Sequence, residues 1–306
     1  MNLRVNEWIR MKVCLVVIFN HRYDKNLNRI RKLYAGRFSA IRFLVPFYDG
    51  TDKDVITVYD SSYQFQGFVA QARERLMNEG FEYYFFIADD LILNPAINEN
   101  NFLTELSMKK GDSMHRGVFL LQDSLWTVER INDAIETFTM QVHTNYQNEL
   151  MNKAEAIETM QKYGYGNIHI SKENHKKMAD WKGFTAKYGW KKTKQLKTLQ
   201  ELPYPLLGGY SDWFILPYED LDLVSRKFGV TAAMRLFVEI AVPTIMFLYC
   251  KSIRRLRETK YKDGSIWDNH ILEELGTNCN WQLEELMMNF PEDKLYLHPI
   301  KLSKWS

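Results

Sequence analysis

Short apolar runs alternate with amphipathic stretches over the first 95 residues. Each run lacks polar alternation, which is typical of a strand buried on both faces of a sheet. The runs occupy residues 12–20, 41–47, 55–59 and 82–88. Between them, residues 26–34 and 64–78 carry apolar side chains at helical spacing, and Gly80 follows as a helix stop. The alternation predicts an α/β fold with a mostly parallel central sheet flanked by helices.

The pattern changes after residue 101, where longer helical stretches predominate. Helices are expected at 127–163, 221–227, 231–242, 251–260 and 268–275, and strands at 117–122, after Asp212 and from residue 295. No internal repeat and no low-complexity linker divides the chain. We therefore predict one domain over residues 1–306.

The composition narrows the functional classes. The chain has 306 residues, 46 % hydrophobic and 25 % charged, and its net charge of +2 gives no global field for nucleic acid. The three cysteines show no paired spacing, which favours a reducing compartment. Residues 1–11 lack an apolar signal region, and the apolar stretch 229–250 contains two central charges. We expect a cytoplasmic protein without a nucleic-acid partner.

Two adjacent carboxylates, Asp89 and Asp90, follow the apolar run 82–88. Open α/β sheets bind ligands at the carboxyl ends of their strands. Two carboxylates there repel each other unless a cation neutralises them, so the pair indicates a hard divalent metal holding a phosphate-bearing ligand. The alternative is structural: one Asp caps the next turn and its neighbour is solvated.

Two later stretches carry further candidate chemistry. Residues 203–217 place two glycines, a tyrosine and Asp212 ahead of a short apolar strand, and the glycines bring the backbone close to another group. The tail combines His298-Pro299 with Lys301 after a strand pattern.

With these motifs in this order, the chain resembles nucleotide-sugar glycosyltransferases of the GT-A fold. The resemblance covers residues 13–305 and lies in motif order and context. It implies a single GT-A-like domain with a Rossmann-like sheet and a helical acceptor-side insertion. Residues 12–125 would bind the nucleotide sugar, and residues 126–306 the acceptor, with the tail returning to the metal site.

The resemblance implies that Asp89, Asp90 and His298 hold the metal. Oxygen ligands suit Mg²⁺ or Mn²⁺, and a histidine nitrogen favours Mn²⁺. Ile87 stands where the family's motif has its first Asp, which leaves the number of direct protein ligands open. The alternative for His298 is a structural turn histidine.

The expected donor is a nucleotide-diphosphate sugar, with a UDP-sugar in first place. The resemblance assigns its binding to strand-end and tail residues: Asn20, His21, Asp49, Asp52, Asp60, Gln71, Arg73, Asp90 and Lys301. For the aspartates the alternative is ordinary turn chemistry.

The expected acceptor is a glycan or a lipid-linked glycan, as in polysaccharide biosynthesis. Asp212 is the candidate general base of an inverting reaction; the alternative is that it caps the following element. The candidate acceptor residues are Gly208, Gly209, Tyr210, Ser211 and Trp213, with Tyr210 and Trp213 stacking on sugar faces. Glu239 is a second buried carboxylate, expected to pair with Arg235 one helical turn earlier.

Two other functional classes stay open. A nucleotidyltransferase of related fold also uses metal-binding carboxylates, but usually has a glycine-rich loop after the first strand, and residues 19–24 contain no glycine. A non-catalytic nucleotide- or glycan-binding protein is supported by Ile87. The Lys- and aromatic-rich stretch 172–200 suits peripheral contact with the inner face of a membrane, an acidic glycan, or simply solvent.

Overall fold

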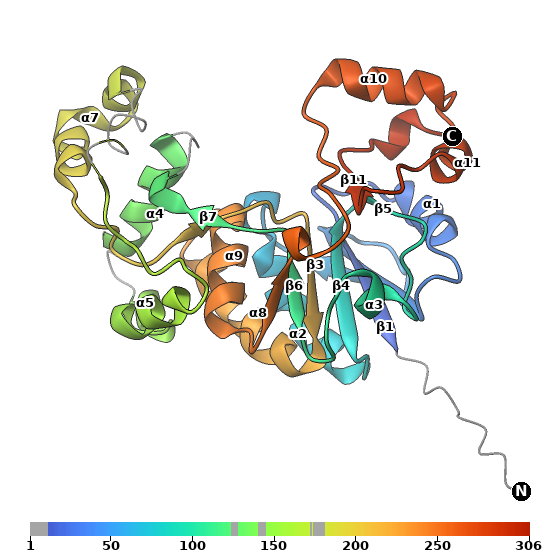
Figure 1. The fold of residues 1–306 in the computed structure, drawn as a ribbon, viewed down its shortest axis with the longest axis horizontal. Coiled ribbons are helices and arrows are strands. Elements are labelled where there is room, and N and C mark those ends of the chain that lie inside the picture. Colours follow the sequence, from blue (N-terminus) through green and yellow to red (C-terminus); the bar gives the residue numbers. More distant parts are fainter. Residues whose placement is uncertain (1–11, 124–127, 140–144, 172, 174–180) are drawn as a thin grey trace, which may run out of the picture.

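A mostly parallel sheet forms the centre of the protein, whose computed structural model describes residues 12–123, 128–139, 145–171, 173 and 181–306 (Figure 1). Its strands are β1 (Val13–Ile18), β2 (Ala40–Pro46), β3 (Val55–Val58), β4 (Tyr83–Ala88), β6 (Ser113–His115), β9 (Trp213–Pro217) and β10 (Ile253–Arg255). Among the described residues, these seven strands lie in the order β10-β6-β9-β4-β1-β2-β3. β9 runs antiparallel to β4 and β6, and the other pairings are parallel. The predicted α/β class with a mostly parallel sheet is confirmed.

β1 and β4 lie side by side near the centre of the sheet, and every residue in both is therefore buried. They pair in register, with Val13 opposite Tyr83 and Ile18 opposite Ala88, so both strands end at the same level. The chain leaves β1 for β2 and β3 on one side and returns to β4 on the other. Such a reversal of strand order opens a crevice at the carboxyl ends, where α/β proteins bind ligands.

Helices cover both faces of the sheet, since the strands present apolar side chains on both sides. One face packs against α2 (Gln66–Asn78), α8 (Tyr218–Ala233) and α9 (Val238–Tyr249), and the other against α1 (Asn26–Leu33), α3 (Phe102–Glu105) and α11 (Leu283–Met288). α10 (Asn269–Asn278) lies above α11 at the outer end of the C-terminal segment (Figure 1).

A helical segment leaves the sheet between two short strands, β7 (Phe119–Leu120) and β8 (Leu207–Gly208), which pair with each other. Its helices are α4 (Val128–Thr139), α5 (Lys153–Gln161) and α7 (Trp181–Thr198), seen at the left in Figure 1. Part of the stretch 172–200, namely 172 and 174–180, lies outside the described residues. Among the helices that are described, none has the length and apolar character needed to cross a membrane.

The C-terminal tail returns to the end of β4 through a small antiparallel pairing. There β5 (Ile92–Leu93) pairs with β11 (Tyr296–Leu297). The N–H of Asn94 donates to the Leu295 carbonyl (2.8 Å), and the N–H of Ile300 donates to the Asp90 carbonyl (2.6 Å). The tail is therefore hydrogen-bonded on both sides of the Asp pair's turn.

Some predicted elements are wrong. Residues 251–260 form β10 and a 3-10 turn instead of a helix, because Ile253–Arg255 pair with β6 in the central sheet. The helix expected over 231–242 breaks at Arg235, whose φ is 59°, so α8 and α9 are separate. The strand expected at 117–122 is β7, which lies outside the central sheet. β6 joins the central sheet instead, between β10 and β9.

Candidate active site at the carboxyl edge of the sheet

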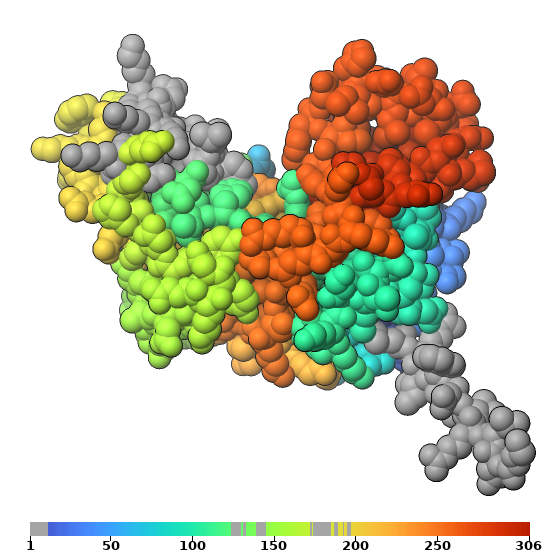
Figure 2. Space-filling view, in the orientation of Figure 1, coloured from blue at the N-terminus to red at the C-terminus, as the bar shows by residue number. Residues whose placement is uncertain are grey.

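Side chains from distant parts of the chain meet at the carboxyl edge of the sheet, at the top in Figure 1. Asn20 follows β1, Asp89 follows β4 and Arg116 follows β6. Because β9 runs antiparallel, Asp212, just before it, reaches the same edge. The upper surface is hollowed there, between the red C-terminal segment and the green and yellow helical segment (Figure 2).

Asp89 directly follows β4 in a partly buried position beside a second carboxylate. Its N–H donates to the Ile18 carbonyl (2.9 Å), which continues the pairing with β1, and its Oδ1 accepts from the Asn20 N–H (3.4 Å). Burial, and after it the charge of Asp90, raises the pKa of the Asp89 carboxyl to about 7. A cation at this edge would relieve repulsion that the two aspartates create.

The tail places an imidazole beside Asp90. His298 Nε2 lies 3.1 Å from Asp90 Oδ1. Burial lowers the pKa of His298, but the hydrogen bond and charge of Asp90, together with Asp212 and Asp89, outweigh burial and raise it overall. The prediction that the strand end and the tail meet is confirmed.

The donor atoms at this point suit a metal ion that is shared with a ligand. Within the described residues, no group of three or more His, Cys, Asp or Glu side chains is arranged to hold a metal by itself. Asp90 and His298 offer a carboxylate and an imidazole, and His298 Nδ1 has no hydrogen-bond partner in the described part of the chain. Mg²⁺ is commonly bound by one or two carboxylates, with phosphate oxygens and water as the remaining ligands. The residues therefore fit a cation bound jointly with a diphosphate.

Asp212 lies beside β4 on the side away from β1. Its carbonyl accepts a hydrogen bond from the Ala88 N–H (2.7 Å), so Asp212 is next to the residue that precedes the Asp pair. Burial raises the pKa of the Asp212 carboxyl, while the charge of His298 lowers it. A carboxyl with a raised pKa at the carboxyl edge of the sheet is suited to accept a proton.

The residues around Asp212 are more tightly packed than predicted. Tyr210 and Trp213 are 4 % and 0 % exposed, which contradicts the prediction that both rings stack on a sugar. Tyr210 stacks on Tyr296 instead, with ring centroids 5.8 Å apart, and Trp213 packs against the same ring. The Ser211 hydroxyl donates to the Gly209 carbonyl (3.0 Å), which is a structural contact.

The two glycines allow a close approach within the chain itself. A Cβ at Gly208 would lie 2.2 Å from the Phe119 ring, and a Cβ at Gly209 would lie 2.7 Å from the Gly117 carbonyl oxygen. The predicted close approach is real, but the partner is the segment around β7.

The donor candidates of the first strands lie at the same edge, partly engaged with neighbours. Asn20 contacts Asp89 through its backbone, and His21 is exposed. Asp49 is exposed and pairs with Arg22 (2.5 Å), which holds its pKa below the usual range. Asp52 pairs with Arg31 (2.6 Å).

The candidates near α2 serve contacts within the fold. Asp60 pairs with Arg235 (2.8 Å), so the expected pair between Arg235 and Glu239 is wrong. Gln71 Oε1 accepts from the Tyr59 N–H (2.8 Å). Arg73 pairs with Asp222 of α8 and does not join the Asp pair. The helix break before α9 is the reason that Arg235 points to Asp60.

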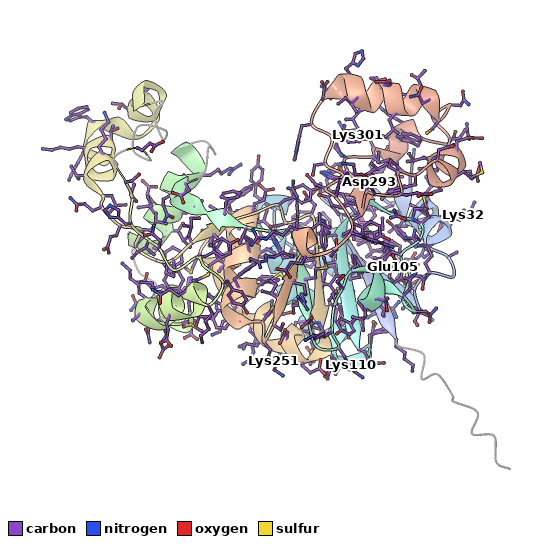
Figure 3. All side chains as sticks on the ribbon, in the orientation of Figure 1. Lys32, Glu105, Lys110, Lys251, Asp293 and Lys301 are labelled. Carbon is purple, nitrogen blue, oxygen red and sulfur yellow. The ribbon has the colours of Figure 1, made fainter. Side chains whose placement is uncertain are left out.

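Lys301 is exposed in the tail, one residue after the Ile300 N–H that bonds Asp90. In Figure 3 it lies in the C-terminal segment near the hollow, whereas Lys110 and Lys251 lie at the opposite, amino edge of the sheet. Lys301 thus lies on the carboxyl side of the sheet.

Arg116 and Glu239 belong to the site more closely than the sequence indicates. The Arg116 guanidinium lies 4.6 Å from the Tyr210 ring centroid and pairs with Asp263. Burial, and after it the charge of Asp212, raises the pKa of Glu239 to about 7, against the opposing charges of Arg130 and Arg116. A carboxylate within an apolar run signals Glu239, but Arg116 becomes visible only once β6 is placed.

Two exposed aromatic rings mark the other end of the crevice. Phe47 and Tyr59, 60 % and 67 % exposed, directly follow β2 and β3, and their ring centroids lie 5.9 Å apart. The Phe47 N–H donates to the Val58 carbonyl (2.9 Å), which fixes the turn. Flat apolar rings at a strand edge are suited to stack on a base or sugar.

Comparison with known proteins gives no assignment: no family model matches the chain, and no curated protein is significantly similar to it.

Proposed function

We propose that the protein is a metal-assisted glycosyltransferase of the GT-A type. It transfers a sugar from a nucleotide-diphosphate donor, a UDP-sugar in first place, to a hydroxyl of a glycan or lipid-linked glycan. One observation carries the proposal: His298 lies 3.1 Å from Asp90 at the crevice of the sheet, with Asp212 just before the neighbouring strand β9. A cation site for a diphosphate next to a proton acceptor is what this transfer requires.

The donor fits along the crevice from β3 to β4. Phe47 and Tyr59 offer exposed rings to a nucleobase, and Asn20 lies between them and the Asp pair in strand order. Lys301, exposed one residue after the Ile300 N–H that bonds Asp90, supplies positive charge to the diphosphate.

A bound Mn²⁺ or Mg²⁺ would be held by Asp90 and His298 and would stabilise negative charge on the departing diphosphate. Asp89 adds negative charge behind this pair and keeps the edge attractive to cations. The reaction therefore needs few direct protein ligands, in agreement with Ile87 at the position of the family's first Asp.

The acceptor hydroxyl attacks the anomeric carbon as the bond from that carbon to the diphosphate oxygen breaks. Asp212 takes the hydroxyl proton, because its partly buried carboxylate has a raised affinity for protons. Glu239 lies near enough to be influenced by the charge of Asp212. Repulsion between the two carboxylates therefore favours a proton on one of them.

Incubation of the purified protein with a panel of nucleotide sugars and Mn²⁺ tests the function. We expect slow, metal-dependent hydrolysis of one donor, accelerated by an oligosaccharide acceptor. Binding of a nucleotide sugar without turnover would instead support a non-catalytic binding protein. If the protein neither binds nor hydrolyses any nucleotide sugar of the panel, the proposal is excluded.

A further inference from the structure

Trp267 is the exposed aromatic ring of the Asp212 side of the site. It precedes α10, and at 73 % it has the largest exposure among the bulky apolar side chains of the described residues. Its ring is nevertheless held against the site: the centroids of Tyr210 and His298 each lie 6.3 Å away, in edge-to-face geometry. An exposed indole held beside the catalytic candidates offers a flat apolar surface to a ligand.

The backbone on both sides of Trp267 is fixed. Before it, the Ile266 N–H donates to the His298 carbonyl (2.7 Å), and the His298 N–H donates to the Gly264 carbonyl (3.2 Å). A Cβ at Gly264 would lie 1.4 Å from the Tyr296 carbonyl oxygen, so only glycine permits this approach. After it, the Asp268 carboxylate caps α10 by accepting from the His270 N–H (2.8 Å). The ring is thus pre-positioned, which lowers the entropy cost of binding.

Its place in the fold selects the ligand. Phe47 and Tyr59 follow β2 and β3, on the β1 side of the Asp pair. Trp267 contacts Tyr210, two residues before Asp212 and on the β9 side. A donor that extends from the first strands to the metal site therefore ends before Trp267, and the indole faces the substrate whose hydroxyl Asp212 deprotonates.

We propose that Trp267 is the stacking surface for a pyranose ring of the acceptor, an inference that rests on the proposed glycosyl transfer. The apolar C–H face of the sugar covers the indole, and its hydroxyls stay in water or reach Arg116. Trp267 takes the role that the sequence assigned to the buried Trp213. It sets acceptor affinity and leaves donor binding unchanged.

The test compares Trp267→Ala and Trp267→Phe with Trp190→Ala. Trp190, 66 % exposed on α7, is a matched surface tryptophan of the helical segment. The full-length proteins, with UDP and Mn²⁺ present, are applied to an oligosaccharide array, and UDP binding is measured separately by calorimetry. We expect Trp267→Ala to weaken glycan binding about tenfold or more, Trp267→Phe to retain part of it, and Trp190→Ala to behave as wild type.

The two readouts separate the inference from the function it rests on. Unchanged glycan binding by Trp267→Ala, or no glycan bound by the wild type, overturns the acceptor role. If Trp267→Ala loses UDP binding as strongly as glycan binding, Trp267 belongs to the donor site or to the fold, and the acceptor role is also overturned. If the wild type neither binds UDP nor hydrolyses any nucleotide sugar, the proposed transfer is overturned, whatever the array shows.

Discussion

Partly buried carboxyl groups carry the proposed chemistry at the scale of single residues. Burial raises the pKa of Asp89, Asp212 and Glu239, because a charged carboxylate is less stable away from water. Asp90, in contrast, has the imidazole of His298 at 3.1 Å. The proposal accordingly gives Asp90 the cation and gives Asp212, whose affinity for protons is raised, the acceptor proton.

Replacing Asp212 by Asn should abolish transfer and leave donor binding near normal. Asparagine keeps the shape and the backbone bond to Ala88, but it cannot accept a proton. We expect kcat to fall by about 10² to 10⁴ with nucleotide affinity within about twofold. Asp222→Asn, which removes the pairs with Arg73 and Arg226 away from the Asp pair, is the control. A parallel loss of nucleotide binding would place Asp212 in the donor site or the fold.

Glu239→Gln should change the pH dependence of stability. The folded-state pKa of Glu239 is about 7, above its ordinary value of 4.5, so the stabilisation exists below pH 4.5 and is lost as the pH rises through 7. Glutamine does not titrate. Between pH 5 and pH 8 the unfolding free energy of the variant should therefore fall by about 1–3 kcal/mol less than that of the wild type. Urea unfolding at the two pH values measures this, and identical pH slopes would contradict it.

At the scale of elements, the sequence predicts what local burial controls. β1 to β4 and the helices between them follow from apolar runs and helical spacing, because each buries its own side chains. β6 is hidden since Ser113-Met114-His115 contains one apolar residue, and Arg116 is missed with it. The inward position of Trp213 depends on strand register, which sequence spacing alone does not set.

The tail is the element on which the site depends most. Ile300→Ala removes a side chain that is 1 % exposed and loosens the backbone that bonds Asp90. We expect about 2–4 kcal/mol of destabilisation together with a loss of nucleotide affinity. Ile30→Ala, at a site 2 % exposed in α1 against the same core, should destabilise similarly but keep nucleotide affinity. Calorimetry on the folded variants decides; equal affinities would show that the tail does not align the site.

At the scale of the whole molecule, the hollow is bounded by parts of different origin. The sheet edge supplies Asp89, Asp90 and Asp212, the C-terminal segment supplies His298, and the helical segment forms the facing wall (Figure 2). A ligand that contacts the edge and the tail together stabilises the folded state, because it binds only where both are in place.

UDP with Mn²⁺ should therefore raise the unfolding temperature. At a ligand concentration of about 100 times Kd the stabilisation is about 2.7 kcal/mol, which shifts Tm by at least about 2 °C. Addition of EDTA should remove most of the shift, and so should Asp90→Asn or His298→Ala. A scanning calorimeter measures both conditions. The same shift with and without the metal would show that nucleotide binding does not use the cation.

The antiparallel pairing of β5 with β11 also orders events during synthesis. His298 follows Asp90 by 208 positions in the chain, from 90 to 298. At about 5–20 residues per second, roughly 10–40 s pass between the emergence of the two halves of the site. A nascent chain that has already formed the central strands still lacks His298 and the C-terminal segment that carries Trp267. Under the proposed function, transfer would therefore begin only when translation has passed the tail, and incomplete chains would consume no activated sugar.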